Sequence, residues 1–444
     1  MLKRKFTAKT QLHENNNQAL IEYFEQTRAT YSQALRETFQ YVKHANSFNK
    51  SKYNTYLQNK YDITKRTANS IINDAQGRYN ALVELKKYEQ KQLQRRIDYL
   101  SSTLIPKLTE ELQDDLVMMK YGLTVSLIKH HNLRRKIVAK KNRLNRYRQQ
   151  LANLNYQLSN HKLKLCFGTT KLLKSNYSKF IEQRDSQMTF VGAKAETGCN
   201  QMLQLSYLPK LNQFKIQLRK DFHGFKQAKR DARYAFGQCY FRYYQNDIKH
   251  ILDQQNSPLT FKIIKQDQRY YLYCVFEIQV DNFKTSSQNG LIGLDFNKGF
   301  ITYGEINQYG HLCDTKRFNY RFCAGNCTTN DLAQIANQIV ALCRQTGKSI
   351  AIEDLDFKNK KAKREKHQCK KYNQMIHSLA YRKYVELLEN IAYRNDILVT
   401  RVNPAWTSWL AKHLFCSSMK LNIHIGAAYE IARRGLGFKD KVVA

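Results

Sequence analysis

The sequence predicts an α+β multidomain protein, in which a helical region is inserted into a β module and an α/β domain follows. Three changes of pattern support this prediction. Apolar residues recur with helical spacing over residues 11–185, alternate as in strands over 186–289, and form short strands between helices over 290–444. A short basic strand at residues 1–10 is assigned to the same β module as 186–289. A chain of 444 residues is also too long for one core.

The net charge of the chain favours a polyanionic partner. The sequence has 74 Lys and Arg against 36 Asp and Glu, which gives a formal charge of +38. Such a charge repels itself in a compact state unless a partner neutralises it. Acidic residues are absent between Val117 and Ile181, where 15 Lys and Arg occur. Nucleic acid is therefore the first candidate partner, and a solvated basic surface without a specific partner is the alternative.

The composition argues against a membrane or secreted protein. The sequence contains no run of 18 apolar residues, so no membrane span and no membrane partner are predicted. The segment Met1 to Phe6 is charged and lacks the apolar core of a signal peptide. The 10 cysteines are sparse and irregularly spaced, which is typical of reduced thiols. A cytoplasmic protein is expected, and its oligomeric state is left open.

Residues 80–165 are predicted to form two long helices that fold back on each other. A leucine-rich stripe follows each helix, and Pro106 is expected to end the first. The stripes account for the helix–helix core. The opposite face of the second helix is strongly basic and is the candidate nucleic-acid surface: Arg134, Arg135, Lys136, Lys140, Lys141, Arg143, Arg146 and Arg148.

Residues 186–289 are predicted to form a β-barrel or sheet module. Short segments such as 214–218 and 270–276 alternate between apolar and polar residues, as half-buried strands do. One helical insert is expected near residues 226–250.

The segment 290–444 has an RNase H-like order of elements. Three strands separated by turns are expected at 291–296, 300–303 and 311–318, followed by a helix over 329–346 and a strand at 349–353. A helix over 374–394, a strand at 398–402 and a final helix over 423–435 complete the series.

Two acids end predicted strands of this segment. Asp295 ends the first strand and Glu353 the fourth. These strands are neighbours in an RNase H-like sheet, so the carboxylates are expected to converge. Paired carboxylates suit Mg²⁺ or Mn²⁺, and two such ions can activate water against a phosphodiester. A pair of solvated acids at strand ends is the structural alternative.

Three segments resemble the RuvC-type nuclease motifs of TnpB proteins, which are transposon-encoded, RNA-guided relatives of type V CRISPR effectors. These segments are Gly293-Leu-Asp295, Ile352-Glu-Asp-Leu-Asp356 and Asn403-Pro-Ala-Trp-Thr-Ser408. Ala427-Ala428-Tyr429 and Ile431-Ala-Arg-Arg-Gly-Leu-Gly437 resemble the last helix of that family. The close match covers roughly residues 290–438.

The resemblance implies a function for each region. It implies a wedge-like β module at 1–10 and 186–289, a helical nucleic-acid recognition region at 11–185, and a RuvC-like nuclease domain at 290–444. It also implies a guide RNA and a double-stranded target DNA as partners, with the protein itself contacting only a short flanking motif and the duplex shape. Asp295 and Glu353 would be the first two catalytic acids and metal ligands.

The third catalytic position departs from the family pattern. His424 stands where the family commonly has an Asp. An imidazole suits Mg²⁺ less well than a carboxylate, but it can accept a proton from an attacking water. A working Asp–Glu–His site, a site that has decayed, and a histidine with a structural role all remain open.

Two other features bear on the nuclease prediction. The paired cysteines of a zinc ribbon are missing, since Thr407 to Asn422 contains only Cys416, and no zinc site is predicted. The run Lys358 to Lys371 is basic and follows Glu353 directly. It can hold a nucleic-acid strand or form a charged loop; its candidate contacts are Lys360, Lys361, Lys363 and Arg364.

The sequence therefore predicts an RNA-guided DNA-binding protein and metal-dependent DNA endonuclease of transposon origin. One alternative is a nuclease-dead, RNA-guided DNA binder that acts as a transcriptional repressor. A second is a transposase-like recombinase, which would use the same acids. A third is a basic RNA-binding protein without a catalytic site.

Overall fold

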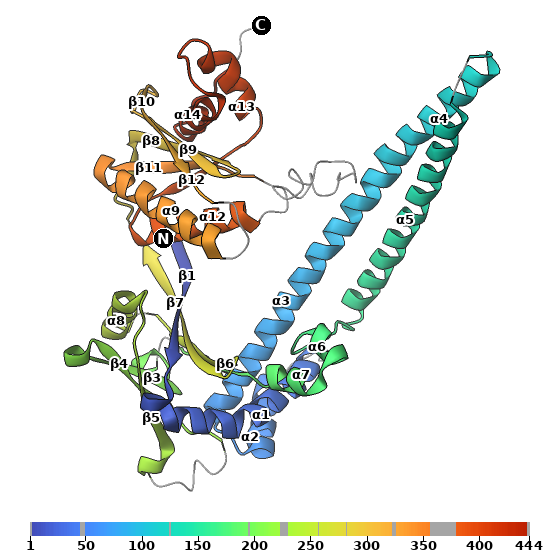
Figure 1. Ribbon diagram of the computed structural model, residues 1–444. Coiled ribbons are helices and arrows are strands. Elements are labelled where there is room, and N and C mark those ends of the chain that lie inside the picture. Colours follow the sequence, from blue (N-terminus) through green and yellow to red (C-terminus); the bar gives the residue numbers. More distant parts are fainter. Residues whose placement is uncertain are drawn as a thin grey trace. The chain divides into compact units, whose positions relative to one another are not determined.

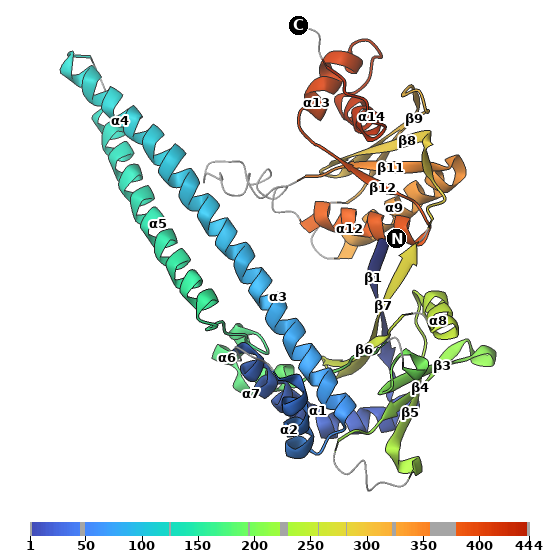
Figure 2. The same cartoon turned by 180° about the vertical axis from the view of Figure 1, so that it is seen from behind.

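The computed structural model describes residues 2–44, 49–123, 126–193, 196–222, 230–255, 257–280, 282–321, 326–355 and 379–441. The chain divides into two compact units. The N-terminal unit comprises Lys3–Ile278, and the C-terminal unit comprises Gln279–Ala444 with Met1–Leu2. None of the described helices combines the length and the apolar composition needed to cross a membrane. Figures 1 and 2 show the elements of both units.

The N-terminal unit combines helices with two open sheets. One sheet has the strand order β1-β7-β6-β2 and the other has the order β3-β4-β5. The strands are β1 (Leu2–Leu12), β2 (Gln187–Phe190), β3 (Leu203–Leu208), β4 (Gln213–Arg219), β5 (Tyr234–Cys239), β6 (Thr260–Gln266) and β7 (Arg269–Val280). The first strand of the chain thus shares a sheet with strands some 260 residues later.

Two predictions for this β module differ from the structure. A β-barrel or a sheet module was predicted, and the described strands form two separate open sheets, so the barrel alternative differs from the structure. The helix predicted near 226–250 is wrong in its extent, because β5 (Tyr234–Cys239) occupies its middle and helix α8 begins only at Gln245 and ends at Gln254. Alternate residues of β5 are buried, among them Ala235 and Cys239, and it pairs with β4, so sheet pairing decides its conformation.

The helices of the N-terminal unit include a long hairpin. Besides α8, the described α-helices are α1 (Glu14–His44), α2 (Lys50–Tyr61), α3 (Lys65–Asp98), α4 (Ile105–Lys120), α5 (Leu127–Ser159), α6 (Thr170–Ser175) and α7 (Tyr177–Arg184). Helices α3 and α4 form one arm and α5 the other, as predicted (Figure 1). Leu100, Leu104 and Leu108 pack against Ile137 and Leu144 in the seam between the arms.

Pro106 does not end the first arm, contrary to the prediction. A π-helical turn, Tyr99–Leu104, joins α3 to α4, and Pro106 lies in the first turn of α4. The N–H of Ile105 donates to the carbonyl of Leu100, five residues back. The wider turn changes the hydrogen-bond register just before the proline. Pro106 then lies in the first turn of a new helical segment, where a missing backbone N–H costs least.

The C-terminal unit is built on one five-stranded sheet with the order β10-β9-β8-β11-β12. The strands are β8 (Ser286–Asn297), β9 (Phe300–Ile306), β10 (Leu312–Asn319), β11 (Lys348–Glu353) and β12 (Val399–Val402). Strands β8, β9 and β10 are antiparallel, while β11 runs parallel to both β8 and β12. The three antiparallel strands and the helix–strand alternation after them were predicted from the sequence.

Helices cover both faces of this sheet (Figures 1 and 2). Helices α9 (Asn326–Thr346) and α12 (Leu379–Arg394) pack on one face, where Ile292, Leu294 and Ile352 point. Helix α14 (Ile423–Gly435) packs on the other face, against Leu291 and Ala351. The short helix α13 (Thr407–Leu410) and the π-helical turn Ala411–Cys416 connect β12 to α14. Among the described residues, α9, α12 and α14 lie where the sequence predicted helices.

Candidate functional site

The register between β8 and β11 places Asp295 and Glu353 at the same edge of the sheet. Leu294 pairs with Ile352, and the two acids are the next residues on these parallel strands. Adjacent strands lie about 4.8 Å apart, so the two backbones are neighbours at this point. Side chains alternate along a strand, and the residues two positions earlier, Gly293 and Ala351, face α14. Both carboxylates therefore belong to the α14 face.

Two glycines let α14 approach the sheet closely. Gly293 and Gly304 are paired across β8 and β9. A Cβ atom on Gly293 would lie 2.0 Å from the carbonyl oxygen of Ala428, and one on Gly304 would lie 3.0 Å from the backbone nitrogen of Tyr429. The helix thus rests directly on the strand backbone. His424 lies four residues before Ala428 on the helix, and Asp295 lies two residues after Gly293 on the strand. Both separations span about 6 Å, so the contact between Ala428 and Gly293 places His424 beside Asp295.

His424 lies against Asp295 at the start of α14. Its Nδ1 is 3.3 Å from Asp295 Oδ2, and its backbone N–H donates to the side chain of Asn422, the N-cap of the helix, at 2.9 Å. The ring of His424 packs edge-on against Phe300, with 5.1 Å between ring centroids. The side chain of His424 is 39% exposed and that of Asp295 13% exposed. The imidazole is therefore partly exposed to solvent, while the carboxylate that it contacts is largely buried.

Neighbouring polar groups orient both carboxylates. Asn297 donates from Nδ2 to Asp295 Oδ2 at 2.7 Å. The hydroxyl of Thr407 donates to the Glu353 carboxylate, and the hydroxyl of Tyr381 donates to the Glu353 main-chain oxygen at 2.5 Å. Burial raises the pKa of Tyr381, and the charge of Glu353 raises it further, so this phenol stays protonated as a donor.

The three predicted catalytic residues are thus joined in two different ways. Asp295 and His424 are in contact, whereas Glu353 is related to Asp295 through the strand register. Within the described ranges, no group of three or more His, Cys, Asp or Glu side chains is arranged to hold a metal ion. Two carboxylates with bound water are a common ligand set for Mg²⁺, so Asp295 and Glu353 are the residues that can hold such an ion.

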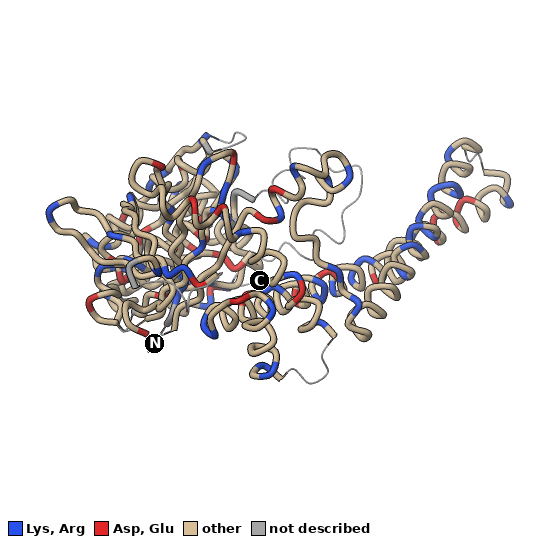
Figure 3. The backbone as a smooth tube through the Cα atoms, turned by 90° about the horizontal axis from the view of Figure 1, so that it is seen from below, with Lys and Arg blue, Asp and Glu red and all other residues tan. Residues whose placement is uncertain are grey.

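The predicted nucleic-acid contacts on the hairpin all lie on α5. Arg134, Arg135, Lys136, Lys141 and Arg143 are exposed, and Lys140 is partly buried. Basic residues recur along the hairpin in Figure 3. The other predicted contacts, Lys360, Lys361, Lys363 and Arg364, lie outside the described residues.

Sequence reasoning did not assign roles to Thr407, Asn297 and Arg434. Arg434 donates from Nη1 to the carbonyl oxygens of Asn403 and Ala405, at 2.7 Å each, and from Nε to Glu430 Oε1 at 2.8 Å. It therefore ties α14 to the loop after β12. The signal for Thr407 was present, because it belongs to the Asn403–Ser408 motif, but only the tertiary fold brings it to Glu353.

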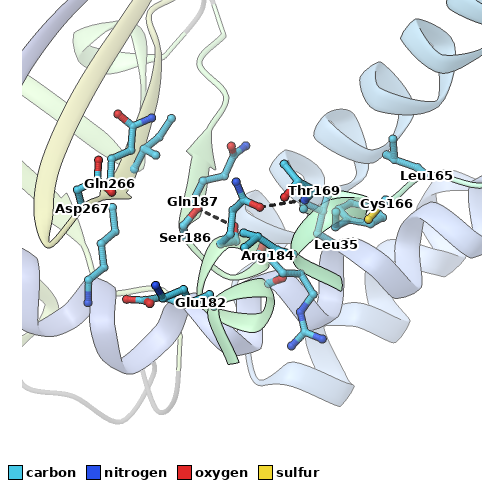
Figure 4. A pocket seen from close by; sticks show the side chains of 18 of the residues that line it. Leu35, Leu165, Cys166, Thr169, Glu182, Arg184, Ser186, Gln187, Gln266 and Asp267 are labelled. Carbon is cyan, nitrogen blue, oxygen red and sulfur yellow. Dashed lines mark hydrogen bonds between the residues drawn. The ribbon is translucent and has the colours of Figure 1, made fainter. Parts of the chain in front are cut away.

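The N-terminal unit has a cavity of about 1090 Å³ of its own (Figure 4). It is lined by parts of α1 and α3, the segment 165–172, α7 and the turn between β6 and β7. Gln183 shapes its wall by accepting from the backbone N–H of Thr169 at 2.9 Å, while its carbonyl accepts from the hydroxyl of Ser186 at 2.8 Å. Neither Asp295 nor Glu353 is among the residues that line this cavity.

Comparison with known proteins gives structural neighbours only. No protein-family model and no curated protein matches the chain. A solved Cas12f1 complex with single-guide RNA and target DNA is similar at 10% identity and a TM-score of 0.39, covering 97% of this chain and 98% of that one. A Cas12i1 R-loop complex after target DNA cleavage is similar at 11% identity and a TM-score of 0.23, covering 89% of this chain and 51% of that one.

Proposed function

We propose that the chain is an RNA-guided DNA-binding protein and metal-dependent DNA endonuclease of the TnpB type, with its active site at Asp295, Glu353 and His424. Its origin would be a transposon. Residues 290–444 would be the RuvC-like nuclease domain, 11–185 the nucleic-acid recognition region, and 1–10 with 186–289 the wedge-like module. The partners would be a guide RNA and a double-stranded target DNA.

The observation that carries this proposal is that Asp295 on β8 and Glu353 on β11 lie at the same end of two paired parallel strands. The acids of two motifs lie 58 residues apart in the sequence, and the parallel pairing of Leu294 with Ile352 makes them neighbours on one face. A third motif contributes Thr407, whose hydroxyl donates to the Glu353 carboxylate. The last helix contributes His424, whose ring contacts the Asp295 carboxylate. Four separate segments of the resemblance thus contribute to one site.

The donor set fits a hard divalent cation. Asp295 and Glu353 would hold Mg²⁺ or Mn²⁺ through carboxylate oxygens, and such an ion would lower the pKa of bound water and offset phosphate charge. Asn297 and Thr407 hold the two carboxylates in place by hydrogen bonds. With Nδ1 of His424 directed at Asp295, its other ring nitrogen, Nε2, is free of that contact and would accept a proton from an attacking water.

The hairpin would contribute electrostatic binding. Exposed Arg and Lys side chains on α5 would contact phosphates, because each such contact releases counterions and adds affinity without sequence preference. Sequence recognition would be left to base pairing with the guide RNA, as in other RNA-guided systems.

The deciding experiment uses the protein expressed together with its native flanking DNA. We expect a discrete RNA to co-purify, and a DNA target that matches its guide segment to be cut when Mg²⁺ is present. Asp295→Ala should abolish cutting and leave guided binding unchanged, because it removes a metal ligand but no phosphate contact. Random co-purified fragments, or cutting that survives Asp295→Ala, would overturn the proposal. Rejoined strands would indicate the recombinase.

A nuclease-dead repressor is the second candidate, and one observation favours it. Asp295 Oδ2 already receives both Asn297 Nδ2 and His424 Nδ1, so a metal ion must compete for this oxygen. In that case the wild type would bind its guided target and leave it intact in Mg²⁺ and in Mn²⁺. Asp295→Ala and His424→Ala would then be indistinguishable from the wild type in binding and in cutting.

A further inference from the structure

Two exposed tryptophans stand next to the candidate site. Trp406 and Trp409 are the only tryptophans in the chain. Their exposed fractions are 71% and 45%, and their rings meet edge to face with 6.1 Å between centroids. Leaving a large aromatic ring in water forgoes the burial energy that normally places tryptophan inside a protein. A pair of such rings at one place therefore calls for a binding partner.

The backbone under Trp406 is held in a costly conformation. Trp406 has φ 66° and ψ 8°, in the left-handed region that a bulky residue rarely adopts. Asn403 Oδ1 accepts from the N–H of Ala405 at 2.9 Å, and Arg434 donates to two carbonyls of the same loop. The Trp406 carbonyl accepts from the N–H of Leu410 at 2.8 Å. These contacts fix the loop while the ring of Trp406 remains in solvent.

The loop is tied directly to the candidate site. Thr407, the residue after Trp406, is buried, and its hydroxyl donates to the carboxylate of Glu353. Consecutive Cα atoms are about 3.8 Å apart, so the Trp406 side chain starts close to that carboxylate. His413 packs on Trp409, with 4.3 Å between ring centroids. Trp409 is thus covered in part, and Trp406 presents the more open ring.

We infer that Trp406, supported by Trp409, is a stacking platform for an unpaired nucleobase of the strand that enters the Asp295–Glu353 site. This inference rests on the proposed function, which supplies the strand. The occupant follows from chemistry: a chain of charge +38 attracts polyanions, and every nucleobase has a flat face that stacks on an aromatic ring.

The platform also selects the form of the strand. A base inside a duplex is covered on both faces by its neighbours, so it offers no face to a ring. Only a single strand, or a base turned out of a duplex, does so. The platform therefore selects an unpaired base, in a single strand or turned out of a duplex, over a base stacked inside a duplex, and this selection is independent of base sequence.

The test uses tryptophan fluorescence of the full-length protein, since both tryptophans belong to the platform. The probes are a short oligothymidylate, the same-length oligouridylate, an abasic deoxyribose-phosphate strand and a DNA duplex. We expect saturable quenching by oligothymidylate or oligouridylate, and little quenching by the abasic strand or the duplex at equal phosphate concentration. The two single strands distinguish DNA from RNA as the source of the base.

Variants separate the two rings. Trp406→Gly removes the ring, and glycine accepts the left-handed conformation, so the fold should be retained and thermal unfolding should confirm it. Its affinity for oligothymidylate should fall about 5- to 150-fold, the range that corresponds to one stacked base. Trp406→Phe should lose much less. Trp409→Phe is the matched control, because it keeps Trp406 and should keep its quenching.

The outcomes are distinguishable from those of the proposed function, because this assay needs no metal ion, guide or cleavage. Equal quenching by the duplex and the single strand would overturn the inference, and so would unchanged affinity in a folded Trp406→Gly variant. Quenching in a protein that never cuts would leave the platform standing and remove the nuclease. Guided cutting without quenching would support the nuclease and exclude the stacking platform.

Discussion

At the residue scale, His424 decides whether the candidate site can work. Its contact with Asp295 Oδ2 at 3.3 Å suits a proton acceptor held in a fixed orientation. If the site is active, His424→Ala should slow guided cleavage by roughly 10²–10⁴-fold, the usual scale of one general base. His424→Asp should keep or raise activity, because a carboxylate suits a hard metal better. Single-turnover cleavage rates check both, and equal rates for all three proteins would exclude a role for His424.

Gly293 lies where helix α14 packs directly on the backbone of β8. A Cβ here would lie 2.0 Å from the Ala428 carbonyl oxygen and 2.6 Å from the Ala432 backbone nitrogen, so α14 would have to move. Gly293→Ala should destabilise the C-terminal unit by about 1–3 kcal/mol or more, the scale of an overpacked core. Because His424 stands on α14, guided cleavage should fall as well. Thermal or urea unfolding measures the first effect.

Gly77 is the matched control. It lies in the middle of α3, and an added Cβ would meet nothing within 4 Å. Gly77→Ala should stabilise the protein by about 0.5–1 kcal/mol, because alanine loses less backbone entropy in a helix. Destabilisation by both variants to the same degree would contradict the assignment of the Gly293 effect to α14 packing.

Glu430 gives the C-terminal unit a pH dependence. The residue is fully buried on α14, and burial together with the charge of Asp440 raises the pKa of Glu430 to about 7. An acid whose pKa is raised by folding binds more protons in the native state. Its contribution to the free energy of unfolding is therefore retained below the unfolded pKa near 4.5 and lost as the pH rises to about 7.

Glu430→Gln mimics the neutral form and should remove this dependence. Between pH 5 and pH 8 the wild type should lose up to about 3 kcal/mol of unfolding free energy more than the variant does. Urea unfolding at both pH values measures the difference. Parallel pH profiles for the two proteins would show that Glu430 keeps its ordinary pKa in the fold.

At the element scale, most basic residues of the acid-free segment lie on helix α5, and most of these are exposed. Ile137 and Leu144 bury one side of the helix in the hairpin seam, while Arg134, Arg135 and Lys136 stay exposed. Replacing these three with Ala should weaken RNA or DNA binding. It should also lower the slope of log affinity against log salt by up to about 2–3, because each lost phosphate contact removes about 0.7–0.9.

Lys86 and Lys87 on α3 are the control for this prediction. They pair with Glu89 and Glu84 at 2.8 and 2.9 Å, so their charges are already compensated. Replacing both with Ala should change the salt slope much less per residue than the α5 variant does. Equal changes per residue would mean that the slope follows net charge and not a binding face.

At the scale of the whole molecule, the charge of +38 sets two opposite responses to salt. Free of nucleic acid, the protein should become more stable as salt rises from about 20 to about 300 mM, because ions screen its self-repulsion. Its affinity for nucleic acid should fall over the same range. Thermal unfolding and filter binding at matched salt concentrations test both. A melting temperature that falls with salt would contradict the first.

The sequence alone located the five strands and the helices α9, α12 and α14 of the C-terminal unit, and it singled out Asp295, Glu353 and His424 as candidate site residues. Strand and helix periods are local properties of the chain, so 291–296, 349–353 and 423–435 were located from the pattern of apolar residues alone. The heptad-like stripes likewise predicted the hairpin. Local patterns were insufficient at Pro106, where a π-helical turn before the proline lets the helix continue, and at β5, where pairing with β4 decides the conformation.

Only the tertiary structure decided what lies next to what. The contact of His424 with Asp295 depends on α14 resting on Gly293, and the contact of Thr407 with Glu353 depends on the path of the loop after β12. Neither partner is near the other in the sequence. Register and close packing are non-local: they follow from how whole strands and helices fit together, which no spacing within one segment encodes.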